Sequence, residues 1–349
     1  MFSTYKSEDV TILLKDITGM VTPLGTKERE KAIQSGVHYS EMLPIEYVPS
    51  QKYLELFFDA LNRYSKMTAE AVAEVSRQIS DGKGKEVVLV SLARAGTPIG
   101  ILIKHYLERF CDVKAFHYTI SIIRGKGIDK NAISYIRERH SDSQIQFIDG
   151  WTGKGAIQRE LRNAMQDYPN IDSGLAVLSD PADMAAKAGT KDDFLIASSC
   201  LNSTVSGLLS RTFYRNDIIG PGEFHGAAFY ADLKNDDLTY TFINSVEENY
   251  EKDLRYHMGK VLIHSGLDEV RNICQEFHIS DVNLVKPSIG EATRVLLRRL
   301  PWKILVHSLS DQEHLGHLYQ LADEKGVELV EYPLKNYRAC GLIKSLADN

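Results

Sequence analysis

The sequence predicts an α/β protein with two domains: a larger N-terminal domain built on a parallel sheet wrapped by helices, and a smaller C-terminal α/β domain. Apolar runs of strand length alternate with helical spacing from residue 86 onward, which is typical of parallel sheets. The alternation restarts after a charged connector near residue 250. A chain of 349 residues, 43% hydrophobic and 25% charged, is long enough to bury two globular cores.

The N-terminal domain is predicted to cover residues 1–250. Glycines and prolines break residues 1–48, so this segment is predicted to be irregular. Apolar residues at helical spacing predict a helix from Ser50 to Ile79. Strands are expected at 86–92, 113–121, 144–149 and 174–179, helices at 98–110, 130–139 and 154–166, and the apolar runs at 193–197 and 239–243 are candidates for further strands.

The C-terminal domain is predicted to cover residues 251–349. A run of charged residues, Glu247 to Lys252, forms the connector that sets this boundary. The pattern after it predicts strands at 260–264, 282–285, 303–307 and 327–331 and helices at 267–277, 290–299 and 311–325.

Composition excludes several classes of function. A net charge of −6 argues against a protein that coats nucleic acid over its whole surface, although a local basic patch is compatible with it. The N-terminus lacks a signal-peptide core and no apolar stretch has membrane-spanning length, so we expect a cytoplasmic protein without a membrane partner. The four cysteines form no CxxC pair, which fits a reducing compartment and gives no zinc signature: Cys111, Cys200, Cys274 and Cys340.

A glycine-rich turn follows the predicted strand at 144–149. Asp149 stands at the strand tip, and a hydroxyl and glycines lead into the next helix. Backbone N–H groups at such a helix start can cradle a phosphate, while the acid can hold ribose hydroxyls or a metal ion. An ordinary tight turn is the structural alternative. The residues of this candidate site are Asp149, Gly150, Thr152, Gly153, Lys154 and Gly155.

A second turn of this kind follows the strand at 86–92. It carries one cation among small residues, and Pro98 then begins a helix. Backbone donors and one charge can wrap a pyrophosphate, and open α/β sheets bind ligands at the carboxyl ends of their strands. The two turns therefore predict one shared site, to which this turn contributes Ser91, Arg94, Ala95 and Gly96.

Together the two turns resemble those of type I phosphoribosyltransferases, over roughly residues 30–245. The resemblance implies Mg²⁺-dependent transfer of a phosphoribosyl group between 5-phosphoribosyl 1-diphosphate (PRPP) and an unidentified nitrogenous base, a nucleobase-like small molecule, with release of pyrophosphate. Arg94 would hold the diphosphate, Arg124 and Lys126 would cap it as part of a glycine-flanked lid, and Asp149 would bind the ribose and the metal. It also implies a hood formed by residues 1–48 and a homodimer.

A closer resemblance covers the whole string. Ser-Ile-Ile-Arg-Gly-Lys-Gly-Ile-Asp at 121–129, together with the Asp149 turn, is similar to the phosphoribosyltransferase-like proteins associated with tellurite-resistance and stress operons. Those proteins are also labelled StiP-type cysteine proteases and carry a C-terminal Pelota-type RNA-binding domain of α/β/α architecture. The resemblance implies a role in a stress response.

A polar segment after residue 197 offers a different chemistry. Cys200 with His225 is the minimum set for thiol nucleophilic catalysis, and the family label supports a cysteine protease or hydrolase. Two alternatives remain: Cys200 is a small buried hydrophobe beside a structural histidine, or the segment lines an acceptor-base pocket. The residues concerned are Cys200, Asn202, Arg211 and His225.

The string from Lys286 to Arg299 resembles the Pelota and kink-turn-binding family, whose signature is Gly-x-Asn-Glu-x-x-Lys at a helix start. Backbone donors there can bind phosphates, and Glu291 could accept from a guanine edge. A capped helix with a solvated basic face is the structural alternative. The implied function is binding of structured RNA, in a protein whose N-terminal domain would sense PRPP or a nucleotide. The residues implied are Lys286, Ser288, Gly290, Glu291, Arg294, Arg298 and Arg299.

Overall fold

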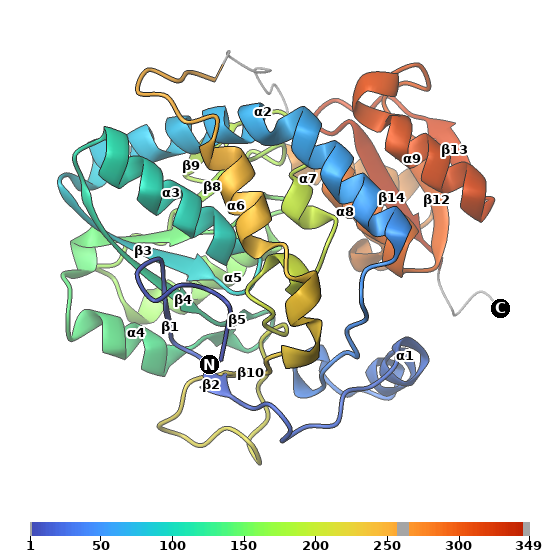
Figure 1. The fold of residues 1–349 in the computed structure, drawn as a ribbon. Helices are drawn as coiled ribbons and strands as arrows, with labels where there is room; N and C mark the ends of the chain where they lie inside the picture. The colour runs from blue at the N-terminus through green and yellow to red at the C-terminus, as the bar shows by residue number, and fades with distance from the viewer. Residues whose placement is uncertain (1, 257–264, 345–349) are drawn as a thin grey trace.

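The computed structural model describes residues 2–256 and 265–344 and contains two packed α/β units (Figure 1). The predicted strand at 260–264 lies outside the described residues. No helix in the described part of the chain combines the length and apolar character needed to cross a membrane.

The N-terminal unit is built on a six-stranded sheet in the order β1-β4-β3-β7-β8-β9, and every neighbouring pair of strands is parallel. This confirms the predicted α/β class. Its strands are β1 (Thr11–Ile12), β3 (Glu86–Leu92), β4 (Lys114–Ile120), β7 (Ile145–Ile148), β8 (Leu175–Ser179) and β9 (Lys187–Thr190).

Helices cover both faces of this sheet, which explains why its central strands are apolar throughout. Alternate residues of β3 point to opposite faces. Val87 and Leu89 pack with α2 and α3, whereas Val88 and Val90 pack with α4 and α5. The helices are α2 (Gln51–Lys83), α3 (Gly96–Phe110), α4 (Lys130–Arg137), α5 (Ala156–Ala164) and α6 (Thr239–Glu247).

Several predicted elements are corrected by the structure. The apolar run at 239–243 is not a strand but the start of α6, in which Phe242, Ile243 and Val246 are buried at helical spacing. The run at 193–197 is buried without being a strand and leads into the short 3₁₀ helix η4 (Ala197–Ser199). A short apolar run fits both the helical and the strand periodicity, so its sequence alone does not distinguish a helix from a strand. Strand β9 was missed because its Lys-Ala-Gly-Thr sequence has little β propensity.

Residues 1–48 are less irregular than predicted. They contain β1, β2 (Lys15–Asp16), α1 (Thr26–Gln34) and the 3₁₀ helix η1 (Tyr39–Glu41). The end of this segment lies against the turn between β5 (Ile122–Ile123) and β6 (Gly127–Ile128). The backbone N–H of Arg124 donates to the Tyr39 hydroxyl (2.9 Å), and Lys126 forms an ion pair with Glu41 (2.6 Å).

The C-terminal unit has a mixed sheet in the order β11-β14-β12-β13, with α7 on one face and α8 and α9 on the other. This confirms the smaller α/β domain. The bounds are α7 (Gly266–Glu276), β11 (Val285–Pro287), α8 (Ile289–Arg298), β12 (Pro301–Val306), α9 (Gln312–Lys325), β13 (Glu328–Glu331) and β14 (Ala339–Ile343), and β14 was not predicted.

The two units share buried contacts. One hydrophobic cluster contains residues of α2 and of α8 and α9, so the core continues from one unit into the other. The carboxylate of Asp193 accepts the backbone N–H of Ile289, at the start of α8, at 3.0 and 3.1 Å, and that of Arg338 at 2.9 Å. The Tyr337 hydroxyl donates to the Gly153 carbonyl (2.6 Å). These bonds fix α8 against the carboxyl ends of the N-terminal strands.

Candidate functional site in the cleft between the domains

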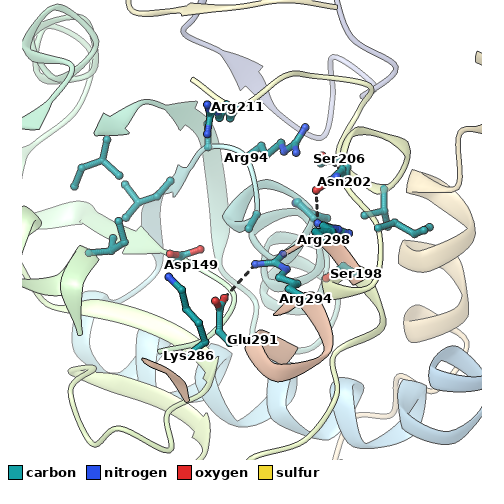
Figure 2. Close-up of a pocket in the computed structure, with 18 of the residues that line it drawn as sticks. Arg94, Asp149, Ser198, Asn202, Ser206, Arg211, Lys286, Glu291, Arg294 and Arg298 are labelled. Atoms are coloured by element: carbon teal, nitrogen blue, oxygen red, sulfur yellow. Dashed lines mark hydrogen bonds and ion pairs between the residues drawn. The ribbon is translucent and has the colours of Figure 1, made fainter. Parts of the chain in front are cut away.

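A cleft of about 390 Å³ lies where α8 faces the carboxyl ends of β3 and β7 (Figure 2). The two turns predicted to bind phosphate, the segment 198–206 and α8 supply most of its lining. Polar and charged side chains dominate its lining: Arg94, Asp149, Ser198, Asn202, Ser206, Arg211, Lys286, Glu291, Arg294, Arg298 and Arg299.

The β3–α3 turn brings Arg94 and Ala95 to the cleft. Gly96 packs so closely on β7 that a Cβ atom would lie 2.6 Å from the Ile148 carbonyl oxygen, which only glycine permits. Arg94 forms an ion pair with the buried Glu46 (3.1 Å). Ser91 is fully buried and hydrogen-bonds the ring of His117 (2.7 Å), so its hydroxyl does not reach the cleft.

The β7–α5 turn places Asp149 in the cleft, but the rest of the turn is occupied by protein contacts. The Lys154 ammonium donates to the Val285 carbonyl (3.0 Å), and burial lowers the pKa of this lysine to about 8. The Thr152 hydroxyl donates to Asp180, and the Gly153 carbonyl accepts from Tyr337. These groups line a smaller adjoining pocket of about 290 Å³. The Lys154 ammonium and the Gly153 carbonyl therefore anchor the turn to the C-terminal domain.

Burial of the Asp149 carboxyl raises its pKa to about 6, despite the backbone N–H of Gly150 that it accepts (2.8 Å). In Figure 2, Lys286 points toward Asp149 across the cleft. Among the described residues, no group of three or more His, Cys, Asp or Glu side chains could hold a metal ion. A single carboxylate whose charge burial disfavours is a poor fit for a resident Mg²⁺ site, because Mg²⁺ prefers ionised oxygen ligands.

The two predicted lid cations have separate partners. Arg124 borders the adjoining pocket, with its guanidinium over the ring of Tyr39. Lys126 forms the ion pair with Glu41 and lies over the ring of Tyr214. Both contacts tie the β5–β6 turn to residues outside the cleft.

Cys200 and His225 are held by different parts of the protein. Cys200 is fully buried beside α8, and its carbonyl accepts from Arg298 (2.8 Å). The ring of His225 hydrogen-bonds Ser121 (2.9 Å), and its backbone N–H donates to Asp129 (2.6 Å). Among the hydrogen bonds and ion pairs of the described residues, none joins Cys200 to His225.

Burial raises the pKa of the Cys200 thiol to about 12, although the guanidinium groups of Arg298 and Arg294 favour the thiolate. The neighbouring residues of the segment, Ser198, Leu201 and Asn202, line the cleft. The thiol therefore lies directly behind the cleft wall, in its protonated form near neutral pH.

Helix α8 presents the residues predicted to bind RNA to the N-terminal domain. Ser288 caps the helix by accepting the backbone N–H of Glu291 (3.3 Å). Arg294 donates to the Ser199 carbonyl (3.1 Å) and lies over the ring of Trp151 (4.7 Å), and Arg298 hydrogen-bonds Asn202. Gly290 lies against Ser199. The part of α8 that carries the predicted signature thus forms a wall of the cleft.

Two residues that organise the cleft were not identified from the sequence. Glu46 pairs with Arg94 from a distant N-terminal segment, and Asp193 holds the start of α8. Neither stands in a motif, and no local pattern could have indicated contacts across 48 and 96 residues. Two neighbouring acids after Lys191 are an ordinary surface pattern.

Comparison with known proteins identifies the class. Residues 3–247 match the family described as "Tellurite-like stress resistance cysteine protease StiP", and residues 264–345 match the Pelota RNA-binding domain. The chain is 35% identical over 374 residues to "Cysteine protease StiP" of Acinetobacter baylyi (strain ATCC 33305 / BD413 / ADP1), covering 98% of this chain and 94% of that protein. The chain belongs to the StiP family and ends in a Pelota-type domain.

Similar solved structures include two phosphoribosyltransferases. A hypoxanthine-guanine enzyme of Bacillus anthracis is 16% identical, with a TM-score of 0.27 over 36% of this chain and 76% of that one. The hypoxanthine enzyme of Trypanosoma cruzi is also 16% identical, with a TM-score of 0.28 over 36% of this chain and 77% of that one. Likenesses this weak carry no functional argument.

The predicted phosphoribosyltransferase activity is wrong, because the family match and the Acinetobacter relative both name a cysteine protease. In the structure, the one cation of the turn expected to bind the 5-phosphate, Lys154, is instead hydrogen-bonded to the C-terminal domain. The sequence also resembled proteins labelled cysteine proteases. The family match and the Acinetobacter relative agree with that label, and not with the phosphoribosyl transfer inferred from the glycine-rich turns.

Proposed function

We propose that this chain is a cysteine-dependent peptide hydrolase of the stress response, with Cys200 as its nucleophile. The observation that supports Cys200 is its position: it belongs to the segment that lines the cleft, next to two guanidinium groups. Of the other cysteines, Cys340 is buried in β14, Cys111 directly follows α3 and Cys274 lies on α7, and none of the three lines the cleft.

The chemistry requires the thiolate of Cys200 to attack a peptide carbonyl, so that a thioester forms and the C–N bond breaks. The leaving nitrogen takes up the proton that the thiol released and departs as an amine, after which water hydrolyses the thioester to a carboxylic acid and the free thiol. A thiol with a pKa of about 12 must first gain access to substrate and lose its proton. Arg298 and Arg294 would stabilise the resulting thiolate. A small displacement of the segment 198–202 from α8 would expose the sulfur to the cleft.

Replacing the nucleophile tests this assignment. We expect Cys200→Ser to lower hydrolysis of dye-labelled casein by roughly 100-fold or more, because a serine hydroxyl without a base is a far weaker nucleophile. Cys111→Ser, a matched change outside the cleft, should retain wild-type activity, and iodoacetamide should inhibit the wild-type protein. Full activity in Cys200→Ser would refute this nucleophile, as would an equal loss in Cys111→Ser.

A second function is supported by the Pelota match over residues 264–345: we propose that the C-terminal domain binds structured RNA. Its cations gather on α8 and on the strand before it, where Lys286, Arg298 and Arg299 line the cleft. Because this surface faces the N-terminal domain, RNA would reach it only at the cleft mouth or after the domains separate.

If this surface binds RNA, removing its cations should lower the affinity for RNA. Arg298→Ala combined with Arg299→Ala should weaken binding of a stem-loop RNA by about tenfold or more at moderate salt, because phosphate contacts supply much of the affinity. Fluorescence anisotropy measures this directly. Arg271→Ala, an exposed cation on α7, is the control and should change little. Equal affinities for all three proteins would exclude this surface.

A further inference from the structure

The lining of the cleft carries more positive than negative side chains. Six cationic side chains and two carboxylates line it. Arg94 has a partner outside the lining in Glu46, and Arg294 pairs with Glu291 at 3.3 Å. Arg211 of the N-terminal domain and Lys286 and Arg298 of the C-terminal domain line the same space.

Neighbouring cations in the cleft repel one another and lower one another's pKa. Burial, together with the charges of Arg294 and Arg94, lowers the pKa of Arg298 to about 10. The pKa of Arg211 is also lowered to about 10, by burial and then by neighbouring arginines that include Arg94. Like charges held together out of water are unfavourable unless a counter-charge joins them. A bound anion would supply it.

Several donors of this cluster lack an acceptor among the residues that the structure describes. The Nε atom of Arg211 is buried without a hydrogen-bond partner among the described residues. The ammonium of Lys286 makes no hydrogen bond or ion pair with another described side chain, although its pKa is lowered by burial. Arg298 uses one N–H of each terminal nitrogen, on Asn202 and on the Cys200 carbonyl. Guanidinium groups have five donors in a planar fork that matches phosphate.

We propose that the cleft binds a small anion of the phosphate class, held between Arg94 of the N-terminal domain and Lys286 and Arg298 of the C-terminal domain. A volume of about 390 Å³ suits a small molecule. In Figure 2 these side chains lie around the cleft, with Arg294 between Lys286 and Arg298 and with Asn202 and Ser206 near Arg298 and Arg94. Because both domains supply ligands, the anion bridges them and stabilises their contact.

Phosphate itself is the probe. Titration calorimetry of the full chain with inorganic phosphate should give saturable heat that chloride at equal ionic strength does not. Lys286→Met and Arg298→Met should each weaken the affinity by about tenfold or more. Arg162→Met, an exposed cation on α5, should leave it unchanged. Arg298 also holds the segment 198–202, so Lys286→Met decides the question if the Arg298 variant fails to fold.

Two results would overturn the proposal: heat from phosphate no larger than from chloride, or wild-type affinity in Lys286→Met. A nucleoside monophosphate compared with its nucleoside distinguishes the source of the anion. Tighter binding of the monophosphate than of phosphate supports a phosphate ester, and equal binding supports free phosphate. A nucleoside that binds as tightly as its monophosphate would refute an anion site. Casein hydrolysis by the same variants is a separate readout, so the anion site can fail while the hydrolase stands.

Discussion

Asp193→Ala is expected to lower the free energy of unfolding by about 3 kcal/mol or more, because it leaves buried N–H groups without an acceptor. Asp193 is buried, and its two oxygens accept the backbone N–H of Ile289 and of Arg338. Both donors belong to the C-terminal domain, so the loss should fall on the contact between the domains. Equilibrium unfolding in urea measures the change.

Two controls separate this effect from a general loss of charge. Asp193→Asn keeps one oxygen acceptor and should cost less than the alanine variant. Asp167→Ala removes a carboxylate that is 61% exposed and paired with Lys130, and we expect a change within about 0.5 kcal/mol. Limited trypsin digestion should cut Asp193→Ala into two domain-sized fragments sooner than wild type. An unfolding free energy for Asp193→Ala close to that of wild type would show that these bonds do not hold the domains.

Gly189→Ala is expected to destabilise the protein by about 3 kcal/mol through overpacking. A Cβ atom at Gly189, in β9, would lie 2.3 Å from the carbonyl oxygen of Ala71 and 2.7 Å from its Cα. Both contacts are with the backbone of α2, which cannot turn aside like a flexible side chain. The helix must therefore move away from the sheet edge. Thermal and chemical denaturation both report the change.

The same substitution elsewhere in the chain provides the control. In Gly316→Ala the new methyl group meets only the flexible side chain of Gln312, at 3.1 Å. Glycine inside a helix costs roughly 0.5–1 kcal/mol relative to alanine, so this variant should be as stable as wild type or slightly more stable. If Gly189→Ala matched Gly316→Ala, α2 and β9 would not be in rigid contact.

The sequence predicted the sheet well, because its strands are apolar runs bounded by clear helices. β3, β4, β7 and β8 lie within a residue or two of their expected bounds. It failed where one apolar run satisfied two periods, as in α6, and where a strand lacked apolar residues, as in β9. Periodicity records burial, and burial alone does not separate a short strand from a short helix.

The candidate site was predicted in pieces rather than as a whole. Arg94, Cys200 and Arg298 were assigned to three different chemistries, and the structure places all three in or directly behind one cleft wall. Residues 48 to 184 positions apart in sequence meet in and beside it, through contacts such as Arg94 with Glu46 and Tyr337 with Gly153. Such contacts depend on how the domains pack, which a single sequence without an alignment does not record.

The placement of α8 has a consequence for how this architecture can be inherited. Two family matches divide the chain at about residue 250, as if the Pelota unit were an accessory that could be gained, lost or exchanged. Yet α8 supplies one wall of the cleft and restrains, through Arg298, the segment that carries the carbonyl of Cys200. A recombinant protein with a Pelota unit from another source would need cations equivalent to Arg294 and Arg298. They would have to match the acceptors that the N-terminal domain presents in the segment 199–202. The two halves are therefore constrained to diverge as one unit.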